Sequence, residues 1–157
     1  MSTYVSWKEF YSVGDPSIDA QHKQFLLLIN ELHDAIRAGN EHEKLKSLLD
    51  RMVLYTMNHF QHEEQLMQAC GYPDFDNHKA EHDQMRRYTE GLRTNLNLVT
   101  GQDVSRFLRD WWINHIMAED QCYIPYLSAA ARQRPLTGAP TQSVGPINWP
   151  GQTPTRQ

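Results

Sequence analysis

Apolar residues recur every three or four positions in four stretches of the chain, and short polar loops separate these stretches. The first stripe consists of Ile18, His22, Phe25, Ile29, Leu32 and Ile36. Similar stripes run from Leu45 to Cys70, from Phe75 to Val99 and from Val104 to Cys122. A repeat of this period is typical of an amphipathic helix that buries one narrow face.

Helix-terminating residues separate the four stretches. Asp15-Pro16 or Ser17 can supply the N-cap and first turn of the first helix, and Gly39 its end. Gly71 and Pro73 end the second helix, Gly101 closes the third, and Pro125 marks the fraying end of the fourth. Four helices joined by short loops predict an all-α, up-down-up-down four-helix bundle preceded by an N-terminal arm.

The composition divides the chain into a folded part and a tail. At 157 residues, with 39% apolar and 22% charged residues, the chain is expected to form one domain. After Ala131 the sequence is rich in proline, has no acidic residue and shows no periodicity. We therefore predict a bundle over residues 1–131 and a disordered tail over residues 132–157.

Charge and cysteine content exclude several classes of protein. The net charge is −4 and no cluster of lysine and arginine is present, so a nucleic-acid partner is not expected. No apolar run reaches the ~18 residues of a membrane span, and the N-terminus has no signal-peptide core. Cys70 and Cys122 form neither a disulfide framework nor a thiolate zinc motif. A cytoplasmic location is expected.

Ionisable residues occupy positions in the buried stripes where leucines would be expected. They are His22, His59, Glu63, His78, His82 and His115. One histidine on such a face is usually an ordinary core residue, but packing alone does not account for six buried polar groups. A metal would give each lone pair a partner.

The predicted topology brings these residues to one end of the bundle. The starts of the first and third helices and the ends of the second and fourth meet there, so the six side chains fall within one layer. His33 and His42 lie too far along their helices to join this layer, and His62 lies off the stripe. These three are expected to be solvated or locally hydrogen-bonded.

The fourth helix leaves a second carboxylate ligand undecided. In a regular helix, Glu119 follows His115 by four residues and shares its face, whereas Asp120 points elsewhere. A π-bulge near His115 would instead turn Asp120 inward. The helical period alone favours Glu119.

The donor set indicates a pair of first-row metal ions. Five imidazoles and two carboxylates exceed the needs of one ion, and carboxylates can bridge two. The chain has no HExxH zinc motif and no Glu-x-x-His motif of the carboxylate-rich diiron proteins. An imidazole-rich diiron pair is suited to giving two electrons to dioxygen and taking them back.

Several of these spacings together resemble the hemerythrin family, most closely its bacterial members. The matching elements are Trp7, Phe10, Val13-Gly14, Ile18-Asp19-Ala20-Gln21-His22-Lys23, His59-Phe60-x-x-Glu63, His78-x-x-x-His82 and Trp111-x-x-Asn114-His115-Ile116-x-x-x-Asp120. The resemblance covers roughly residues 5–127 and implies an iron held by His78, His82 and His115. It implies a second iron held by His22 and His59, with Glu63, Asp120 and an oxo or hydroxo group as bridges.

The resemblance also implies reversible binding of dioxygen, as hydroperoxide, at the five-coordinate iron of His22 and His59. Residues flanking the ligands are candidates for the apolar walls of the dioxygen pocket, namely Phe25, Trp111, Trp112 and Ile116. We expect a monomeric, non-enzymatic protein that stores oxygen, transports it or delivers it to an oxygen-consuming enzyme. A module sensing oxygen or redox state, or a diiron oxidase or peroxidase, are the alternatives.

Overall fold

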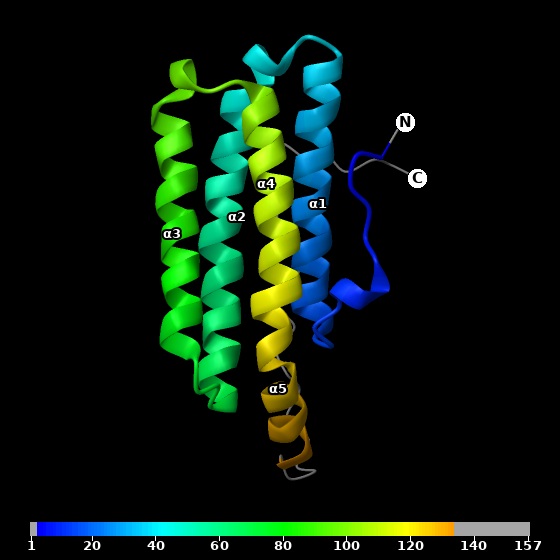
Figure 1. Ribbon diagram of the computed structural model, residues 1–157, viewed down its shortest axis with the longest axis vertical. Coiled ribbons are helices and arrows are strands. Elements are labelled where there is room, and N and C mark those ends of the chain that lie inside the picture. The colour runs from blue at the N-terminus through cyan, green and yellow to red at the C-terminus, as the bar shows by residue number, and fades with distance from the viewer. Residues whose placement is uncertain (1–2, 134–157) are drawn as a thin grey trace, which may run out of the picture.

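The computed structural model describes residues 3–133, which form a bundle of long helices without any strand in that range. The helices are α1 (Pro16–Arg37), α2 (Glu41–Cys70), α3 (Phe75–Thr94), α4 (Gly101–His115) and α5 (Gln121–Gln133). α5 continues the direction of α4, so the two act as the fourth rod of the bundle (Figure 1). α1 packs against α2 and α4, and α2 packs against α3. The predicted all-α four-helix bundle is confirmed.

Local sequence sets the predicted ends of α1 and α2. The Asp15 carboxylate accepts hydrogen bonds from the backbone N–H groups of Ser17 and Ile18, and Pro16 occupies the first helical position. Gly71 ends α2 with a φ of 68°, a left-handed conformation that costs glycine little. Both ends agree with the sequence prediction.

The end of the third helix differs from the prediction. α3 stops at Thr94, a short 3₁₀ turn follows at Leu96–Leu98, and Gly101 begins α4 where we expected it to close the third helix. The side-chain amide of Asn95 donates to the Gly91 carbonyl at 2.8 Å and terminates α3. Thr100 then caps α4 by accepting a hydrogen bond from the Asp103 N–H.

The fourth rod does not fray at Pro125 as the sequence suggested. α5 runs through this proline to Gln133, two residues beyond the predicted domain boundary. Tyr123 is fully buried in a cluster with Val13, Ile18 and Met67, and this packing holds α5 against the bundle. The rest of the tail predicted at 132–157 lies outside the described residues.

The N-terminal arm lies alongside α1 (Figure 1). The Asn30 side chain holds it by accepting hydrogen bonds from the N–H groups of Tyr4 and Val5 and donating one to the Val5 carbonyl. Farther along, the Tyr11 ring meets the edge of the Trp112 ring at 5.2 Å. The arm thus packs onto α1 and α4 close to the layer of predicted ligands.

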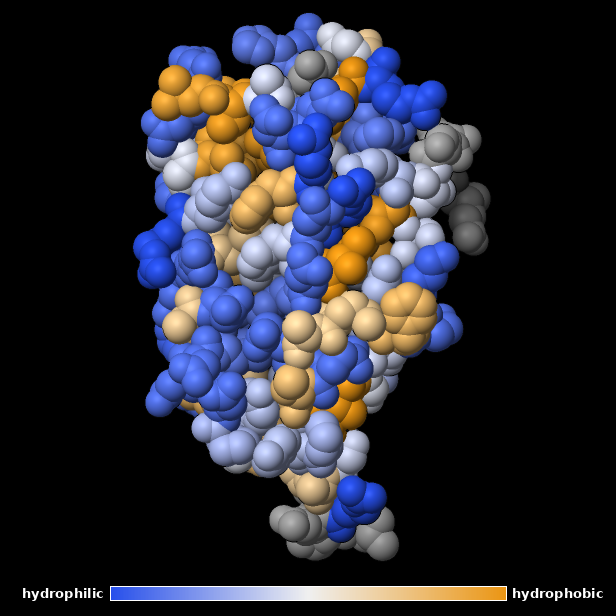
Figure 2. Space-filling view, viewed as in Figure 1, coloured by the Kyte–Doolittle hydropathy of each residue, from blue (hydrophilic) through white to orange (hydrophobic). Residues whose placement is uncertain are grey.

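The surface in Figure 2 is largely hydrophilic, with apolar side chains scattered among charged ones. Within the described residues, no helix is long and apolar enough to cross a membrane. The interior combines an aliphatic and aromatic core with a layer of buried ionisable side chains. That layer is the candidate site.

Candidate metal centre

Side chains from α1, α2, α3 and α4 and from the π-helical turn after α4 meet in the bundle interior. Each predicted ligand is at most 4% exposed: His22, His59, Glu63, His78, His82, His115 and Asp120. They divide into two groups that could hold a metal ion, with all ligand atoms of a group within 4.8 Å of one another. The structure therefore brings together all seven residues selected from the sequence.

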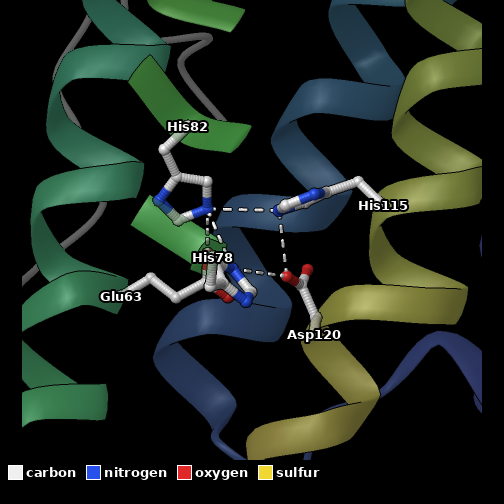
Figure 3. Close-up of side chains that lie close together, drawn as sticks. All are labelled: Glu63, His78, His82, His115 and Asp120. Atoms are coloured by element: carbon white, nitrogen blue, oxygen red, sulfur yellow. Dashed lines mark hydrogen bonds and ion pairs between the residues drawn. The ribbon is translucent and has the colours of Figure 1, made fainter. Parts of the chain in front are cut away.

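The larger group combines three imidazoles with the two carboxylates (Figure 3). The Nε2 atom of His82 lies 3.1 Å from the Nε2 atoms of both His78 and His115. Glu63 Oε2 lies 3.2 Å from His82 Nε2, and Asp120 Oδ1 lies 3.1 Å from His115 Nε2. Five potential donor atoms thus face one small volume.

The smaller group consists of His22, His59 and Glu63, which is shared with the larger group. Its two histidines lie on the other side of the carboxylates of Glu63 and Asp120. His22 Nε2 is 3.3 Å from Asp120 Oδ2, and His59 Nε2 is 3.6 Å from Glu63 Oε2. Asp120 therefore presents one oxygen to each group, and Glu63 Oε2 approaches histidines of both. This arrangement is suited to carboxylates that bridge two ions.

A π-helical turn, Ile116–Asp120, determines which acidic residue of the fourth rod faces the site. Asp120 is fully buried, whereas Glu119 is half-exposed. A π turn contains one more residue than an α turn, so the residue five positions after His115 takes the inward direction. The regular-helix expectation that favoured Glu119 is therefore wrong.

Several buried donor atoms of the site lack a hydrogen bond within the described residues. They are Glu63 Oε2, both carboxylate oxygens of Asp120 and Nε2 of His22. Buried groups of this kind are costly without a partner, and bound cations are a usual way to compensate them. The donor set therefore fits a metal pair.

Electrostatics keep His59 and Glu63 of the smaller group in metal-binding form. Burial lowers the pKa of His59 to about 3 despite the attraction of Glu63, so its imidazole is neutral at pH 7. Burial and Asp120 raise the pKa of Glu63, but His59 and His82 outweigh them and lower it to about 2. Neutral imidazole and ionised carboxylate are the forms that bind metal.

His82 differs from His59. Burial lowers the pKa of His82, but the adjacent carboxylates of Glu63 and Glu64 raise it to about 9. A metal that binds Nε2 of His82 must therefore displace a proton, which makes loading of the larger group pH-dependent.

Three residues that the sequence analysis did not select hold the predicted ligands from behind. Gln21 Oε1 accepts from His59 Nδ1–H at 2.9 Å, Glu64 Oε1 accepts from His82 Nδ1–H at 3.0 Å, and the Tyr123 hydroxyl donates to Glu63 Oε1. Gln21 and Glu64 adjoin ligands in sequence, about 100° around the helix from them, which places them at the edge of the seam. This adjacency was the available signal.

Several other polar residues are at least partly exposed. Glu81 and Asn114 are exposed, and so is His42. His33 stacks on Tyr4 with ring centroids 4.0 Å apart, and His62 is half-exposed and bonded to Gln21. His33, His42 and His62, which were predicted to lie outside the ligand layer, belong to neither metal group.

The four residues proposed as pocket walls do not all lie beside the same group of ligands. The rings of Trp112 and His22 meet edge to face, with centroids 6.1 Å apart. Phe25 stacks on Tyr55, which in turn stacks on His59. These contacts belong to the smaller group. Trp111 is half-buried and stacks on His115 at 4.5 Å, on the side of the larger group. Ile116 is buried in the same core.

Sequence comparison agrees with this geometry. A family profile described as "Hemerythrin HHE cation binding domain" matches residues 13–127, which include all seven predicted ligands. The chain belongs to the hemerythrin family. The match also extends from the loop before α1 to the middle of α5, so it covers α1 to α4 and the first half of α5.

Curated hemerythrin relatives align over most of this chain. The bacteriohemerythrin of Methylococcus capsulatus is 42% identical over 114 residues, which cover 71% of this chain and 86% of that protein. The hemerythrin-like protein of Naegleria gruberi is 34% identical and covers 75% of this chain and 89% of its own. A crystal structure of wild-type hemerythrin superimposes with a TM-score of 0.73 at 36% identity, covering 80% of this chain and 98% of that one.

Proposed function

We propose that the seven buried residues hold two iron ions. His78, His82 and His115 would bind one iron, His22 and His59 the other, and Glu63 and Asp120 would bridge them. The observation that carries this proposal is the placement of Asp120, whose two oxygens face histidines of different groups at 3.3 and 3.1 Å. Membership of the hemerythrin family supports iron as the metal.

We further propose that the site binds dioxygen reversibly for storage, transport or delivery to an oxygen-consuming enzyme. When bound, the iron pair supplies the two electrons that reversible dioxygen binding requires. The smaller group contributes two imidazoles where the larger contributes three, so a metal held there would have the lower number of protein donors. An open position for a small ligand is therefore expected beside His22 and His59.

The residues around that position would exclude water and protons. Phe25, Trp112 and Ile116 are each at most 2% exposed, and Trp112 contacts His22 of the smaller group directly. A dry, apolar surrounding slows protonation of a bound oxygen species and its loss. Trp111 covers His115 and would protect the larger group instead.

The relatives of this chain are named bacteriohemerythrin, hemerythrin-like protein and hemerythrin, which indicates an oxygen-binding protein and not an enzyme. Oxygen binding can be tested directly. Elemental analysis should give two irons per chain, and oxygen added to the anaerobic reduced protein should produce a charge-transfer band that vacuum removes. Irreversible oxidation without this band would refute the proposal.

A matched pair of variants separates the site from the rest of the bundle. His22→Leu removes a predicted ligand of the smaller group, whereas His42→Leu changes an exposed histidine on α2. The first should abolish the oxygenation spectrum and the second should retain it. Equal spectra from the two variants would contradict the assignment of His22.

A further inference from the structure

The Nδ1 atoms of the predicted histidine ligands, which point away from the two groups, differ in their hydrogen-bond partners. His82 Nδ1–H donates to the carboxylate of Glu64, whereas His59 Nδ1–H donates to the neutral amide oxygen of Gln21. Among the described residues, the Nδ1 atoms of His22, His78 and His115 have no hydrogen-bond partner. Each metal group therefore contains one histidine that is held from behind, and the holding groups differ in charge.

His62 contacts the Gln21 amide on the side away from His59. The Nε2–H group of Gln21 donates to His62 Nδ1 at 3.1 Å, while the amide oxygen is farther from that nitrogen, at 3.4 Å. The amide oxygen lies closer to His59 Nδ1, at 2.9 Å. With the amide reversed, an NH₂ group would face the Nδ1–H of His59, donor against donor. Gln21 is only 7% exposed, so water offers little substitute for these contacts.

We propose that Gln21 is a positioning residue that makes the two metal positions chemically unequal. By accepting from Nδ1–H, it holds His59 in the tautomer whose Nε2 lone pair faces the site. By being neutral, it leaves His59 a weaker electron donor than His82, which has a carboxylate behind it. The tautomer rests on the structure alone, and the inequality of the irons rests on the proposed function.

The inequality follows from how hydrogen bonds tune a ligand. A carboxylate acceptor draws the Nδ1 proton toward itself and makes the imidazole more basic, which favours the more highly charged metal. An amide acceptor does this less. The metal at His22 and His59 is then the one that keeps the reduced state more readily, and this is the position with the lower number of donors.

The tautomer is tested in the protein without iron. Long-range ¹H–¹⁵N NMR should show His59 as the Nδ1–H tautomer in the wild type and in Gln21→Glu. Gln21→Leu removes the acceptor and should give a mixture or the Nε2–H form. An Nε2–H form in the wild type, or a Gln21→Leu spectrum equal to the wild type, would overturn the proposal. This result does not depend on oxygen binding, so it separates the two proposals.

The inequality is tested in the iron-loaded protein. Gln21→Leu should bind iron about tenfold more weakly in competition with a chelator, as is typical when a ligand loses its outer partner. Gln21→Glu should favour the oxidised state about tenfold, which for one electron lowers the reduction potential by about 59 mV. Glu64→Gln should raise the potential, since it removes the carboxylate behind His82.

Gln61→Glu is the matched charge control. It adds the same charge on α2, two residues from His59, at an exposed position. Its potential should shift by less than a third of the Gln21→Glu value, because water screens an exposed charge. Equal shifts in the two variants would show that long-range charge, not the hydrogen bond, sets the potential, and would overturn the proposed inequality.

Discussion

The hydroxyl of Tyr123 links α5 to a carboxylate of the candidate metal centre. Tyr123 and Glu63 are both fully buried, and the hydroxyl donates to Glu63 Oε1. Burial, followed by the charges of Glu63 and Asp120, raises the pKa of Tyr123 well above its usual value, so the hydroxyl stays protonated at neutral pH. Glu63 has a pKa of about 2 and is ionised there.

Tyr123→Phe should therefore destabilise the iron-free protein strongly while keeping the ring in its apolar cluster. A hydrogen bond to a charged group contributes about 1.5–3 kcal/mol. The upper value, about 3 kcal/mol, applies here because Glu63 Oε1 would stay buried without its donor. Urea unfolding followed by helical circular dichroism measures this loss. At about 2 kcal/mol per molar urea, the midpoint should fall by roughly 1.5 M.

Tyr126→Phe provides the control for this measurement. Tyr126 lies on the same helix and is 37% exposed, so loss of its hydroxyl should change the unfolding free energy by less than about 0.5 kcal/mol. If the two variants unfold at the same urea concentration, the bond between Tyr123 and Glu63 does not stabilise the fold. Tyr123 would then not hold the Glu63 carboxylate from α5.

Three further predictions concern the metal ligands. Asp120→Asn should reduce the bound iron measured by elemental analysis, whereas Glu119→Gln should not, because only Asp120 faces the site; equal losses would contradict the role of the π turn. In the iron-free protein, folded His59 takes up a proton near pH 3 but an unfolded histidine does so near pH 6.5. The unfolded state thus binds more protons between these values, so the unfolding free energy should decrease as the pH is lowered, by up to about 1.4 kcal/mol per pH unit. His59→Gln should flatten this dependence in urea titrations at pH 7, 5.5 and 4. Ferrous iron at 100 times its dissociation constant should stabilise the anaerobic protein by about 2.7 kcal/mol per site in thermal unfolding, and an unchanged melting temperature would exclude binding to the native state.

The fold was predictable because its signals are local. The steps of three and four in the apolar pattern define each helix, and Asp15 and Gly71 mark ends that depend only on nearby backbone groups. Gly101 was misassigned because a glycine can follow one helix or open the next. The side chains of Asn95 and Thr100 decide between these, and their hydrogen bonds leave no trace in the hydrophobic period.

The ligand candidates on regular helices were visible for a related reason. His22, His59, Glu63, His78 and His82 occupy stripe positions, so each one conflicts with the apolar pattern around it. Asp120 could not be found from this pattern, because the pattern assumes a constant helical period. The π turn changes that period for five residues, and the sequence from Ile116 to Asp120 has no composition that marks it.

The residues that adjust the ligands follow neither rule. Gln21 reaches His59 across 38 positions of sequence, and Tyr123 reaches Glu63 across 60, so neither contact follows from the period of one helix. Both contacts require the packing of one helix on another to be known. The hydrophobic pattern can therefore identify the predicted ligands on the regular helices of this bundle, since each of them interrupts that pattern. It cannot identify what tunes the ligand, because Gln21 lies where the pattern permits a polar residue.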